Sequence, residues 1–402
     1  MVVFLAAAAA FLGSLALTPL ARAMAWKIGA VSRPDGKRRL HARPTALGGG
    51  GAIYLALILG IFGSFALALD AGQDKLPAAL GLSAGMLCLL GFYDDLFDMP
   101  ARWKLLGQIV STLPVVIVGS WISKLVLFGH TFDVGLLGIP WTIGWLVLGI
   151  NALNLLDGVD GLASLLGIVI AVAVGAIAAA ERRPEAMLLA FLLAGALGGF
   201  LVHNLPPARI YLGDSGSMVI GFTLALLAMR VSLLPEEPAA SKVTVAAALL
   251  FVPLLDVLLA VARRAMKRSS FAVADRGHLH HQLLERGLDN WQVLGVLGGY
   301  GSVTVLVAWW VSISEQEVLG WAVLASVTAA LTAGEMIACE EWRLAKRVVR
   351  RAAFRGMRWA AQTRRTARPA DSPEPFILAA SGQFEQDRQP AQEPPLEDRR
   401  AA

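Results

Sequence analysis

The sequence contains little charge and almost no cysteine. Asp, Glu, Lys and Arg make up 16% of the 402 residues, whereas a soluble domain carries about 25%. Two cysteines cannot supply a disulfide framework or a zinc site made of thiolates. The first residues also lack the positively charged start and the cleavage site of a signal peptide, so we expect them to form a membrane span.

Apolar residues take the place of the missing charge. The chain is 56% hydrophobic and its mean hydropathy is +0.62. Apolar runs of about 20 residues, the length needed to cross a bilayer, recur along most of the chain, and runs this long favour helices over a closed barrel. The sequence therefore predicts an all-α polytopic membrane protein with about eleven transmembrane helices, at approximately 1–26, 48–69, 76–92, 105–121, 138–156, 161–180, 186–204, 215–234, 242–262, 291–312 and 318–338.

The connectors between these spans differ in charge. Lys and Arg concentrate in one set, which comprises 27–47, 93–104, 157–160, 205–214, 263–290 and the tail from Glu340. Because positively charged loops stay in the cytoplasm, we expect this set to be cytoplasmic, with the N-terminus outside and the C-terminus inside. Every polar cluster described below lies in or beside this set. We therefore treat the clusters as one site on the cytoplasmic face of a plasma (inner) membrane.

The chain divides into a transmembrane domain, 1–340, and two cytoplasmic segments. Residues 341–368 are basic and amphipathic, and we expect this segment and the basic loops to lie against anionic lipid, with no nucleic-acid partner. Residues 369–402 are rich in Pro, Gln, Asp and Glu, a composition typical of disorder. Alternating apolar residues around Gly129 predict a small hairpin within connector 122–137.

Acidic residues first gather where an apolar span ends, in GFYDDLFDMPARWK. Asp94 and Asp95 are adjacent, Asp98 follows one helical turn later, and Lys104 lies near the start of the next span. Adjacent carboxylates bind Mg²⁺ or exchange a proton, because a neighbouring negative charge raises the pKa of one of them. Taken alone, the stretch is also typical of a helix end that reaches the lipid headgroups.

A second cluster, NALNLLDGVDGLA, places polar residues at every third position inside an apolar span, where lipid would not tolerate them. Their oxygen atoms suit a hard cation, and Gly158 and Gly161 would break the helix and let a ligand approach the backbone. Amide pairing between helices explains one Asn but poorly explains four residues in register. The four residues are Asn151, Asn154, Asp157 and Asp160.

A third cluster, HNLPPARIYLGDSGS, has Tyr211 three residues before Asp214. Residues 213–217 open a helix, whose free N–H groups favour an anion or a metal-bound carboxylate. Simple capping of the helix by Asp214 or Ser215 is the alternative interpretation.

Two further clusters are basic. In DRGHLHH, Arg276 and the histidines could bind phosphate; zinc binding by H-x-H-H and a solvated loop are the alternatives. In RRLHARPTALGGGG, Arg43 and Thr45 precede four glycines, which permit close helix packing or the approach of a ligand. The histidines are His278, His280 and His281.

Taken together, PTALGG, GFYDDLFDMPARWKLLGQ, NALNLLDGVDGLA, NLPPARIYLGDSGS and DRGHLHH resemble, in this order, the polyprenyl-phosphate N-acetylhexosamine-1-phosphate transferases over about residues 30–290. The last motif looks like the branch that uses UDP-GlcNAc, because the phospho-MurNAc-pentapeptide branch usually has three consecutive histidines. Here Leu279 separates His278 from His280.

The resemblance implies a reaction and its cofactor. GlcNAc-1-phosphate would pass from UDP-GlcNAc to a membrane undecaprenyl or decaprenyl phosphate, giving polyprenyl-diphospho-GlcNAc and UMP, the first membrane step of a cell-envelope glycan. Mg²⁺, with Mn²⁺ as the alternative, would be the cofactor, and a homodimer is one possible assembly. Another UDP-N-acetylhexosamine or UDP-MurNAc-pentapeptide is the alternative donor.

The resemblance also implies residue roles. Asp94, Asp95, Lys104 and His278 would be catalytic, and Asn154 and Asp214 would hold the metal. The substrates would contact Arg43, Thr45, Asp157, Gly158, Asp160, Tyr211, Arg276, His280 and His281. From the acidity of a phosphate monoester we further hypothesise that Asp94 receives the residual proton of the lipid phosphate and orients it, while Asp95 supports the metal or Lys104. Attack by Asp94 itself to form a phospho-enzyme is the alternative.

An ion-coupled secondary transporter is the rival class, because intramembrane Asp and Asn residues also coordinate ions. A transporter predicts polar residues near the bilayer midplane and often repeated halves. Here the polar clusters lie at one membrane face and the sequence shows no clear internal repeat.

Overall fold

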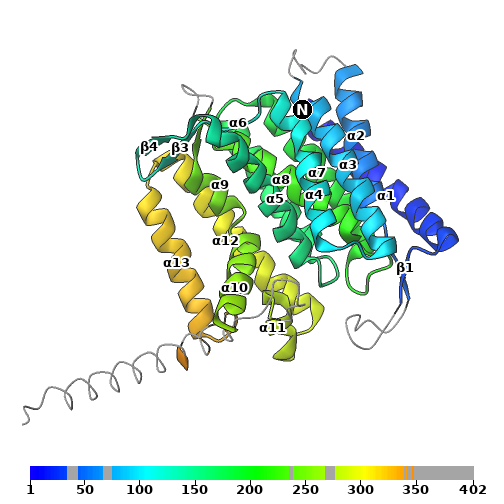
Figure 1. Ribbon diagram of the computed structural model, residues 1–402. Coiled ribbons are helices and arrows are strands. Elements are labelled where there is room, and N and C mark those ends of the chain that lie inside the picture. The colour runs from blue at the N-terminus through cyan, green and yellow to red at the C-terminus, as the bar shows by residue number, and fades with distance from the viewer. Residues whose placement is uncertain are drawn as a thin grey trace, which may run out of the picture. The chain divides into compact units, whose positions relative to one another are not determined.

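The protein is an α-helical bundle with small strands at its two ends (Figure 1). The computed structural model describes residues 1–33, 44–66, 75–234, 239–267 and 277–338, together with residues 341, 344, 346 and 347. Nearly all of the predicted segments 341–368 and 369–402 therefore lie outside the described residues, and both domain boundaries stay predictions.

Seven helices are long and apolar enough to cross a membrane within the described part of the chain. They confirm a polytopic helical protein; eleven spans and their orientation stay predictions. The seven are α1 (Val2–Ile28), α3 (Leu76–Phe97), α5 (Gly138–Leu156, preceded by the 3₁₀ turn η1, Gly135–Leu137), α6 (Leu162–Ala180), α7 (Pro184–Asn204), α8 (Gly213–Val231) and α12 (Asn290–Ser314).

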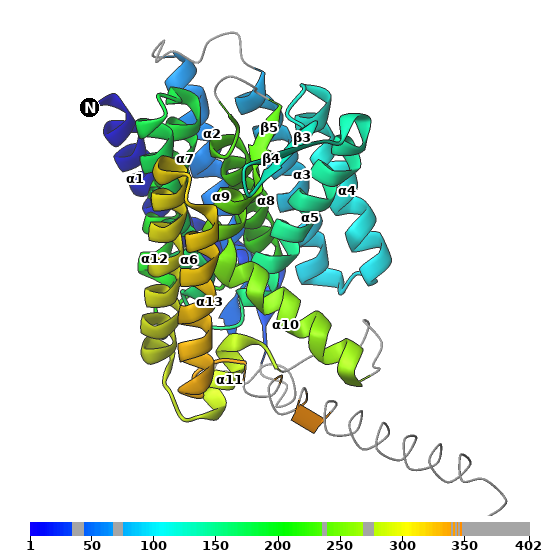
Figure 2. The same ribbon diagram turned by 90° about the vertical axis from the view of Figure 1, so that its left-hand side faces the viewer.

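The other predicted spans hold shorter or broken helices. These are α2 (Gly49–Ala66), α4 (Ala101–Ile117), α13 (Glu317–Ala333) and the pair α9 (Val243–Leu249) and α10 (Phe251–Lys267). The prediction of one continuous span at 242–262 is wrong, because α9 and α10 meet at an angle of 87°. Pro253 explains the break: its ring clashes with the carbonyl four residues earlier and it offers no N–H. Figure 2 shows α10 running obliquely to α9 and away from α12 and α13.

Helix α8 lies at the centre of the bundle, in contact with α2, α3, α5, α6 and α7 (Figure 1). Small residues let the helices touch at their backbones. A Cβ atom on Gly149 of α5 would lie 3.1 Å from the carbonyl oxygen of Gly221 in α8, and one on Gly221 would lie 2.5 Å from the carbonyl oxygen of Gly149. The helix that carries Asp214 in its first turn is therefore packed closely against several neighbours.

Helix α1 packs along α7 through two glycines one turn apart. A Cβ atom on Gly195 or Gly199 would lie 2.1 Å from the carbonyl oxygen of Ala7 or Phe11, respectively. Apolar side chains on the outer helix faces remain exposed, including Leu12 on α1 at 61%. Such exposure on helices of this length fits contact with lipid.

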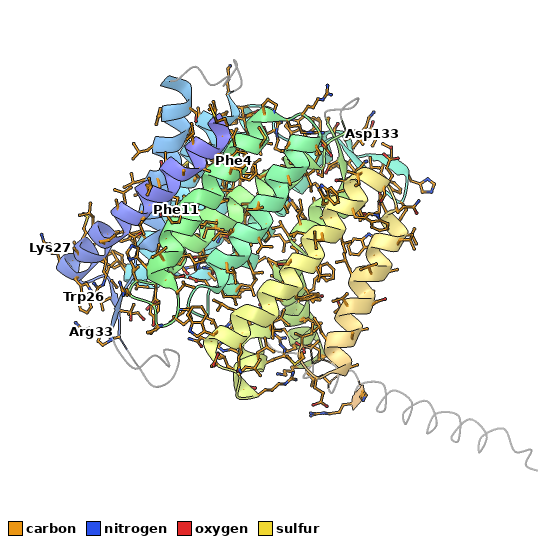
Figure 3. All side chains as sticks on the ribbon, turned by 180° about the vertical axis from the view of Figure 1, so that it is seen from behind. Phe4, Phe11, Trp26, Lys27, Arg33 and Asp133 are labelled. Atoms are coloured by element: carbon orange, nitrogen blue, oxygen red, sulfur yellow. The ribbon has the colours of Figure 1, made fainter. Side chains whose placement is uncertain are left out.

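The described residues of the two sets of connectors lie at opposite ends of the bundle (Figure 1). Figure 3 shows Trp26, Lys27 and Arg33 together at one end of α1, with Asp133 at the far end of the molecule. The first end also carries the two-stranded sheet of β1 (Val31–Ser32) and β2 (Thr45–Ala46), and α11 (Leu279–Glu285). We call this the site end. Which end faces the cytoplasm stays a prediction.

The far end carries the predicted hairpin, which is confirmed. Strands β3 (Lys124–Leu127) and β4 (His130–Asp133) pair antiparallel, and β5 (Ala240–Lys242) pairs parallel to β3. Phe128 and Gly129 form the two-residue turn with φ of 52° and 74°. Positive φ at both turn residues is the type I′ geometry that matches the twist of a hairpin.

Candidate active site

Three helix ends bring together two carboxylates and one ammonium group. The Nζ atom of Lys104, in the first turn of α4, lies 2.7 Å from Asp94 Oδ2 in the last turn of α3. The same ammonium forms an ion pair with Asp214 Oδ2, in the first turn of α8. Asp94 and Asp214 thus share one cation.

The chain reversal between α3 and α4 explains why Lys104 can reach Asp94. Asp98 ends α3 in the left-handed conformation, with φ of 47°, and its N–H bonds to the Asp94 carbonyl. The N–H of Met99 donates to Asp94 Oδ1 at 2.7 Å. Pro100, whose φ is fixed and whose missing N–H is not needed there, then starts α4. The reversal therefore holds Asp94 from its own backbone as well as through Lys104.

Asp95 points elsewhere and caps α8. Its Oδ1 accepts a hydrogen bond from Asp214 N at 2.9 Å, and its Oδ2 accepts one from Ser215 N at 3.3 Å. A carboxylate at a helix N-terminus satisfies free N–H groups and complements the helix dipole. The two adjacent acids therefore have different contacts: Asp94 binds a cation, whereas Asp95 fixes the backbone that carries Asp214.

Glycine makes this contact between α3 and α8 possible. A Cβ atom on Gly91 would lie 2.4 Å from Ser215 N. Gly213 has φ of 72°, and a Cβ atom there would lie 2.5 Å from Asp95 Oδ2. Both positions require a residue without a side chain, since one is overlaid by backbone and the other adopts a left-handed conformation.

The two asparagines of the second cluster have separate partners. Asn154 Nδ2 donates to Asp214 Oδ1 at 2.7 Å and to Ser217 Oγ at 2.9 Å, so Asn154 orients the proposed metal ligand. Asn151 Nδ2 donates to Gln108 Oε1 of α4 at 2.8 Å. Amide pairing between helices thus accounts for Asn151, as the alternative interpretation allowed for one asparagine.

Asp157 follows the end of α5 and lies among other acids. Burial, together with the charges of Asp214, Asp95 and Asp160, raises the pKa of Asp157 well above its ordinary value. A hydrogen bond from the Gly213 N–H acts in the opposite direction. The Asp157 carboxyl group therefore tends to keep its proton.

Asp160 and Asn204 shape the surrounding loops. Asp160 Oδ2 accepts a hydrogen bond from Ala208 N at 2.9 Å. Asn204 Oδ1 accepts one from Gly161 N at 3.1 Å, and its Nδ2 donates to Ile210 O at 3.0 Å. These bonds tie the loop after α5 to the loop before α8.

Thr45 and Tyr211 come together at the edge of the site. Tyr211 N donates to Ala46 O at 2.9 Å, and Gly49 N donates to Tyr211 O at 3.1 Å. Burial raises the pKa of the Tyr211 hydroxyl, a hydrogen bond with the Thr45 side chain lowers it, and the charge of Asp160 raises it further. The segment that starts the second span is thus docked onto the start of α8.

The histidines of α11 lie close to the loop after α5. The rings of His280 and His281 have centroids 4.2 Å apart, and His278 stacks parallel to His280 at 6.0 Å. A Cβ atom on Gly158 would lie 2.2 Å from His280 Nε2. Burial, with the neighbouring His281 and His278, lowers the pKa of His280 well below its ordinary value, so this ring is neutral.

Not every predicted site residue is described. Arg43 and Arg276 lie outside the described residues, and their roles stay predictions. Asp256 was missed: its carboxylate is fully buried and bonds to His278. It is the lone acid within the apolar range 242–262, and an ionisable residue in such a range is a signal of function that could have identified it.

The donor set suits magnesium better than zinc. No group of three or more His, Cys, Asp or Glu side chains is arranged to hold a metal ion within 1–33, 44–66, 75–234, 239–267 and 277–338. Zinc takes three or four protein ligands, whereas Mg²⁺ takes one or two carboxylates and completes its shell with water and phosphate. Asp214, with the Asn154 amide 2.7 Å from its Oδ1, fits this second pattern.

Comparison with known proteins identifies the family. Residues 77–232 match the model of Glycosyl transferase family 4. The chain is 33% identical to the decaprenyl-phosphate N-acetylglucosaminephosphotransferase of Mycobacterium tuberculosis, over 69% of this chain and 74% of that protein. It is 28% identical to a probable undecaprenyl-phosphate N-acetylglucosaminyl 1-phosphate transferase of Bacillus subtilis, over 73% and 81%. It is 32% identical to a phospho-N-acetylmuramoyl-pentapeptide-transferase of a Synechococcus strain, over 75% and 89%. The chain is therefore an enzyme of the polyprenyl-phosphate N-acetylhexosamine-1-phosphate transferase family.

Proposed function

We propose that the protein transfers GlcNAc-1-phosphate from UDP-GlcNAc to a membrane polyprenyl phosphate, giving polyprenyl-diphospho-GlcNAc and UMP. The observation that carries the proposal is the Lys104 ammonium held between Asp94 and Asp214 where α3, α4 and α8 meet. A site that joins two anionic phosphates needs cations fixed in place, and these helix ends provide one. The family match sets aside the ion-coupled transporter.

The metal would be held by Asp214, with Asn154 beside it. When bound, Mg²⁺ or Mn²⁺ would neutralise charge on the diphosphate and orient it. Asn154 fixes the Asp214 carboxylate through the bond to Oδ1. Asp95 fixes the Asp214 backbone. These two contacts support a preorganised ligand, since neither carboxylate rotation nor movement of the helix end is left free.

The lipid phosphate would meet Asp94 and Lys104. A phosphate monoester has a second pKa of about 6, so it is largely ionised at neutral pH and needs little help from a base. Both oxygens of Asp94 already accept hydrogen bonds, from Met99 N–H and the Lys104 ammonium. We assign to Asp94 the orientation of the nucleophile and the uptake of its residual proton, and to Lys104 the binding of phosphate.

The nucleotide would lie beside the loop after α5. Asp157, Gly158 and Asp160 line this loop, and Tyr211 with Thr45 borders it. The bonds of Asp160 and Tyr211 to neighbouring backbone support a fixed rim against which a uridine could pack. Arg43 and Arg276 would complete the phosphate contacts, and His278, His280 and His281 would approach from α11.

We propose GlcNAc as the sugar because of the H-L-H-H pattern and because two relatives are named as N-acetylglucosaminyl phosphate transferases. Leu279 is fully buried, and the histidines on either side of it have different environments: His278 bonds to Asp256, whereas His280 packs at Gly158. We further propose a multi-pass plasma-membrane protein with its site end in the cytoplasm, where nucleotide sugars occur. Binding of anionic lipid by the basic loops, and a homodimer, also stay proposals.

The test is reconstitution of the purified protein with Mg²⁺, polyprenyl phosphate and a panel of UDP-sugars. UMP release together with lipid-linked GlcNAc is the expected result. Lipid-linked product from another UDP-N-acetylhexosamine or UDP-MurNAc-pentapeptide alone would change the donor. No lipid-linked product with any sugar would overturn the function.

A further inference from the structure

Asp256 of α10 is a buried carboxylate that serves two consecutive residues of another segment. Its side chain has no exposed surface. Oδ2 lies 2.9 Å from His278 Nδ1, and Oδ1 accepts a hydrogen bond from Leu279 N at 2.9 Å. Burying a carboxylate is costly unless it is well bonded, and both of these bonds are made to the segment that carries the histidines.

These contacts determine which ring nitrogen of His278 is available. An ionised carboxylate only accepts hydrogen bonds, so His278 must donate its Nδ1–H to Asp256. Nε2 is then the one ring nitrogen left to contact a phosphate, as acceptor when the ring is neutral and as donor when it is protonated. The bond to Leu279 N fixes the backbone next to the ring, so both the tautomer and the position of His278 depend on Asp256.

A second buried group of α10 supports the same segment. Arg263, seven residues after Asp256 and 1% exposed, forms an ion pair with Glu341. Both carboxylate oxygens of Glu341 accept from Gln282 Nε2 of α11 at 3.3 Å, and the same amide donates to Gly277 O at 2.7 Å. The buried face of α10 thus bonds to the start of α11 directly and to its middle through Glu341. The opposite face, with Leu258 64% exposed, is apolar.

We propose that Asp256 is a positioning residue of the transferase: it holds His278 as the Nδ1–H tautomer with Nε2 free for a substrate phosphate. The proposal rests on the function proposed above. The proposal also gives a role to the bend between α9 and α10. Because α10 turns away from the axis of α9, Asp256 lies within hydrogen-bonding distance of His278.

The first test is a double-mutant cycle with Asp256→Asn and His278→Ala. Asparagine keeps the shape of the side chain but presents an amide that donates, which favours the wrong tautomer. We expect kcat to fall by about tenfold to a hundredfold, the usual loss when the partner that orients a ligand is removed, with little change in KM for either substrate. In the His278→Ala background, Asp256→Asn should cost no further activity.

A matched control separates this role from simple loss of a buried hydrogen bond. Thr142→Val, in α5 at the far end, removes the acceptor of the Ile122 N–H bond and should lower thermal stability without lowering kcat of the folded protein. Unchanged kcat in Asp256→Asn, or full additivity with His278→Ala, would overturn the proposal. An inactive wild-type protein would instead overturn the proposed function.

A second measurement does not depend on a folded Asp256 variant. In wild-type protein labelled with ¹⁵N-histidine, the His278 signals are identified by their loss in His278→Gln. We expect a proton on Nδ1, whether or not Nε2 is also protonated. A His278 ring protonated on Nε2 alone would contradict the proposal even if the Asp256 variants fail to fold.

Discussion

Lys104 and Asp214 are 110 residues apart in the sequence and form an ion pair at the meeting of α4 and α8. Asp94 lies on the other side of the same ammonium, at 2.7 Å. The ammonium therefore occupies the oxygens that the proposed metal would need. We infer that Lys104 and the metal would compete for Asp214, and that binding of the metal would release Lys104 toward a phosphate.

Replacing Lys104 separates its binding of phosphate from its competition with the metal for Asp214. Lys104→Met should lower kcat by at least about a hundredfold, because a fixed cation at the reacting phosphates is lost. The same change should raise the affinity of the nucleotide-free protein for Mn²⁺, measured by electron paramagnetic resonance, because the competing ammonium is gone. Arg102→Met, in the same turn but exposed, is the matched control and should change neither. Weaker Mn²⁺ binding in Lys104→Met would contradict the competition.

Substitutions of the adjacent acids Asp94 and Asp95 should affect stability and activity to different extents. Asp95→Ala removes the cap of α8 and should cost about 0.5–2 kcal/mol of stability, measured by thermal unfolding in detergent, with activity falling as Asp214 loses its support. Asp94→Asn keeps the helix end intact and should lower activity with a smaller change in stability. An equal loss of stability in both variants would contradict the assignment of the α8 cap to Asp95 alone.

The pH dependence of the reaction rate of Asp94→Asn tests whether Asp94 accepts a proton from the lipid phosphate. If Asp94 takes up the residual proton of the lipid phosphate, its loss should matter less at pH 9, where the phosphate is fully ionised. Initial rates of wild type and variant from pH 6 to pH 9 are the measurement. If the variant loses as much of the wild-type rate at pH 9 as at lower pH, Asp94 does not accept a proton, and its role is to orient the lipid phosphate. A trapped acyl-phosphate would favour the phospho-enzyme alternative.

Asp157 should make the free protein less stable as the pH rises. Its pKa is raised well above the ordinary value in the folded protein, so the folded state holds this proton more tightly than the unfolded chain does. The stabilising contribution is fully present below the pKa of Asp157 in the unfolded chain, about 3.9. It is lost as the pH rises through the pKa of Asp157 in the folded protein.

The Asp157→Asn variant removes this dependence. It should unfold at a higher temperature than wild type at neutral and alkaline pH, and the difference should shrink on acidification. Asp133→Asn, at an exposed position of β4, should leave the wild-type pH profile unchanged. A variant less stable than wild type at pH 8 would show that the charged form of Asp157 is favoured by contacts not described above.

The helical bundle could be predicted from the sequence because hydropathy is a local property. Each predicted span contains a helix, and the hairpin at Phe128 and Gly129 follows from its alternating residues and its glycine. The bend at Leu250 was missed because the range 242–262 is apolar over most of its length. Pro253 was the local signal, and its effect on the preceding turn outweighs the apolar run.

The site could be predicted as a set of residues but not as a set of contacts. Asp94 and Asp95 are chemically identical in the sequence. The chain reversal between α3 and α4 gives Asp94 a cation, and the packing of α3 on α8 gives Asp95 a helix end. Likewise, Asn151 bonds to Gln108 whereas Asn154 bonds to Asp214. The pairings of Asp95, Asn151 and Asn154 join residues 43 to 119 positions apart, and such pairings depend on tertiary structure, which periodicity does not encode.

Two neighbouring glycines at the start of α2 provide the last test. A Cβ atom on Gly50 would lie 2.2 Å from Gly216 N, against backbone that cannot move without α8, whereas one on Gly51 would meet nothing within 4 Å. Gly50→Ala should therefore displace the start of α8 and cost about 1–3 kcal/mol, with loss of activity because Asp214 moves. Gly51→Ala, in the same helical turn, should be neutral or stabilise by up to about 1 kcal/mol through helix propensity. Thermal unfolding and initial rates measured on both variants decide the matter: equal behaviour would mean that the contact between α2 and α8 is not what positions Asp214.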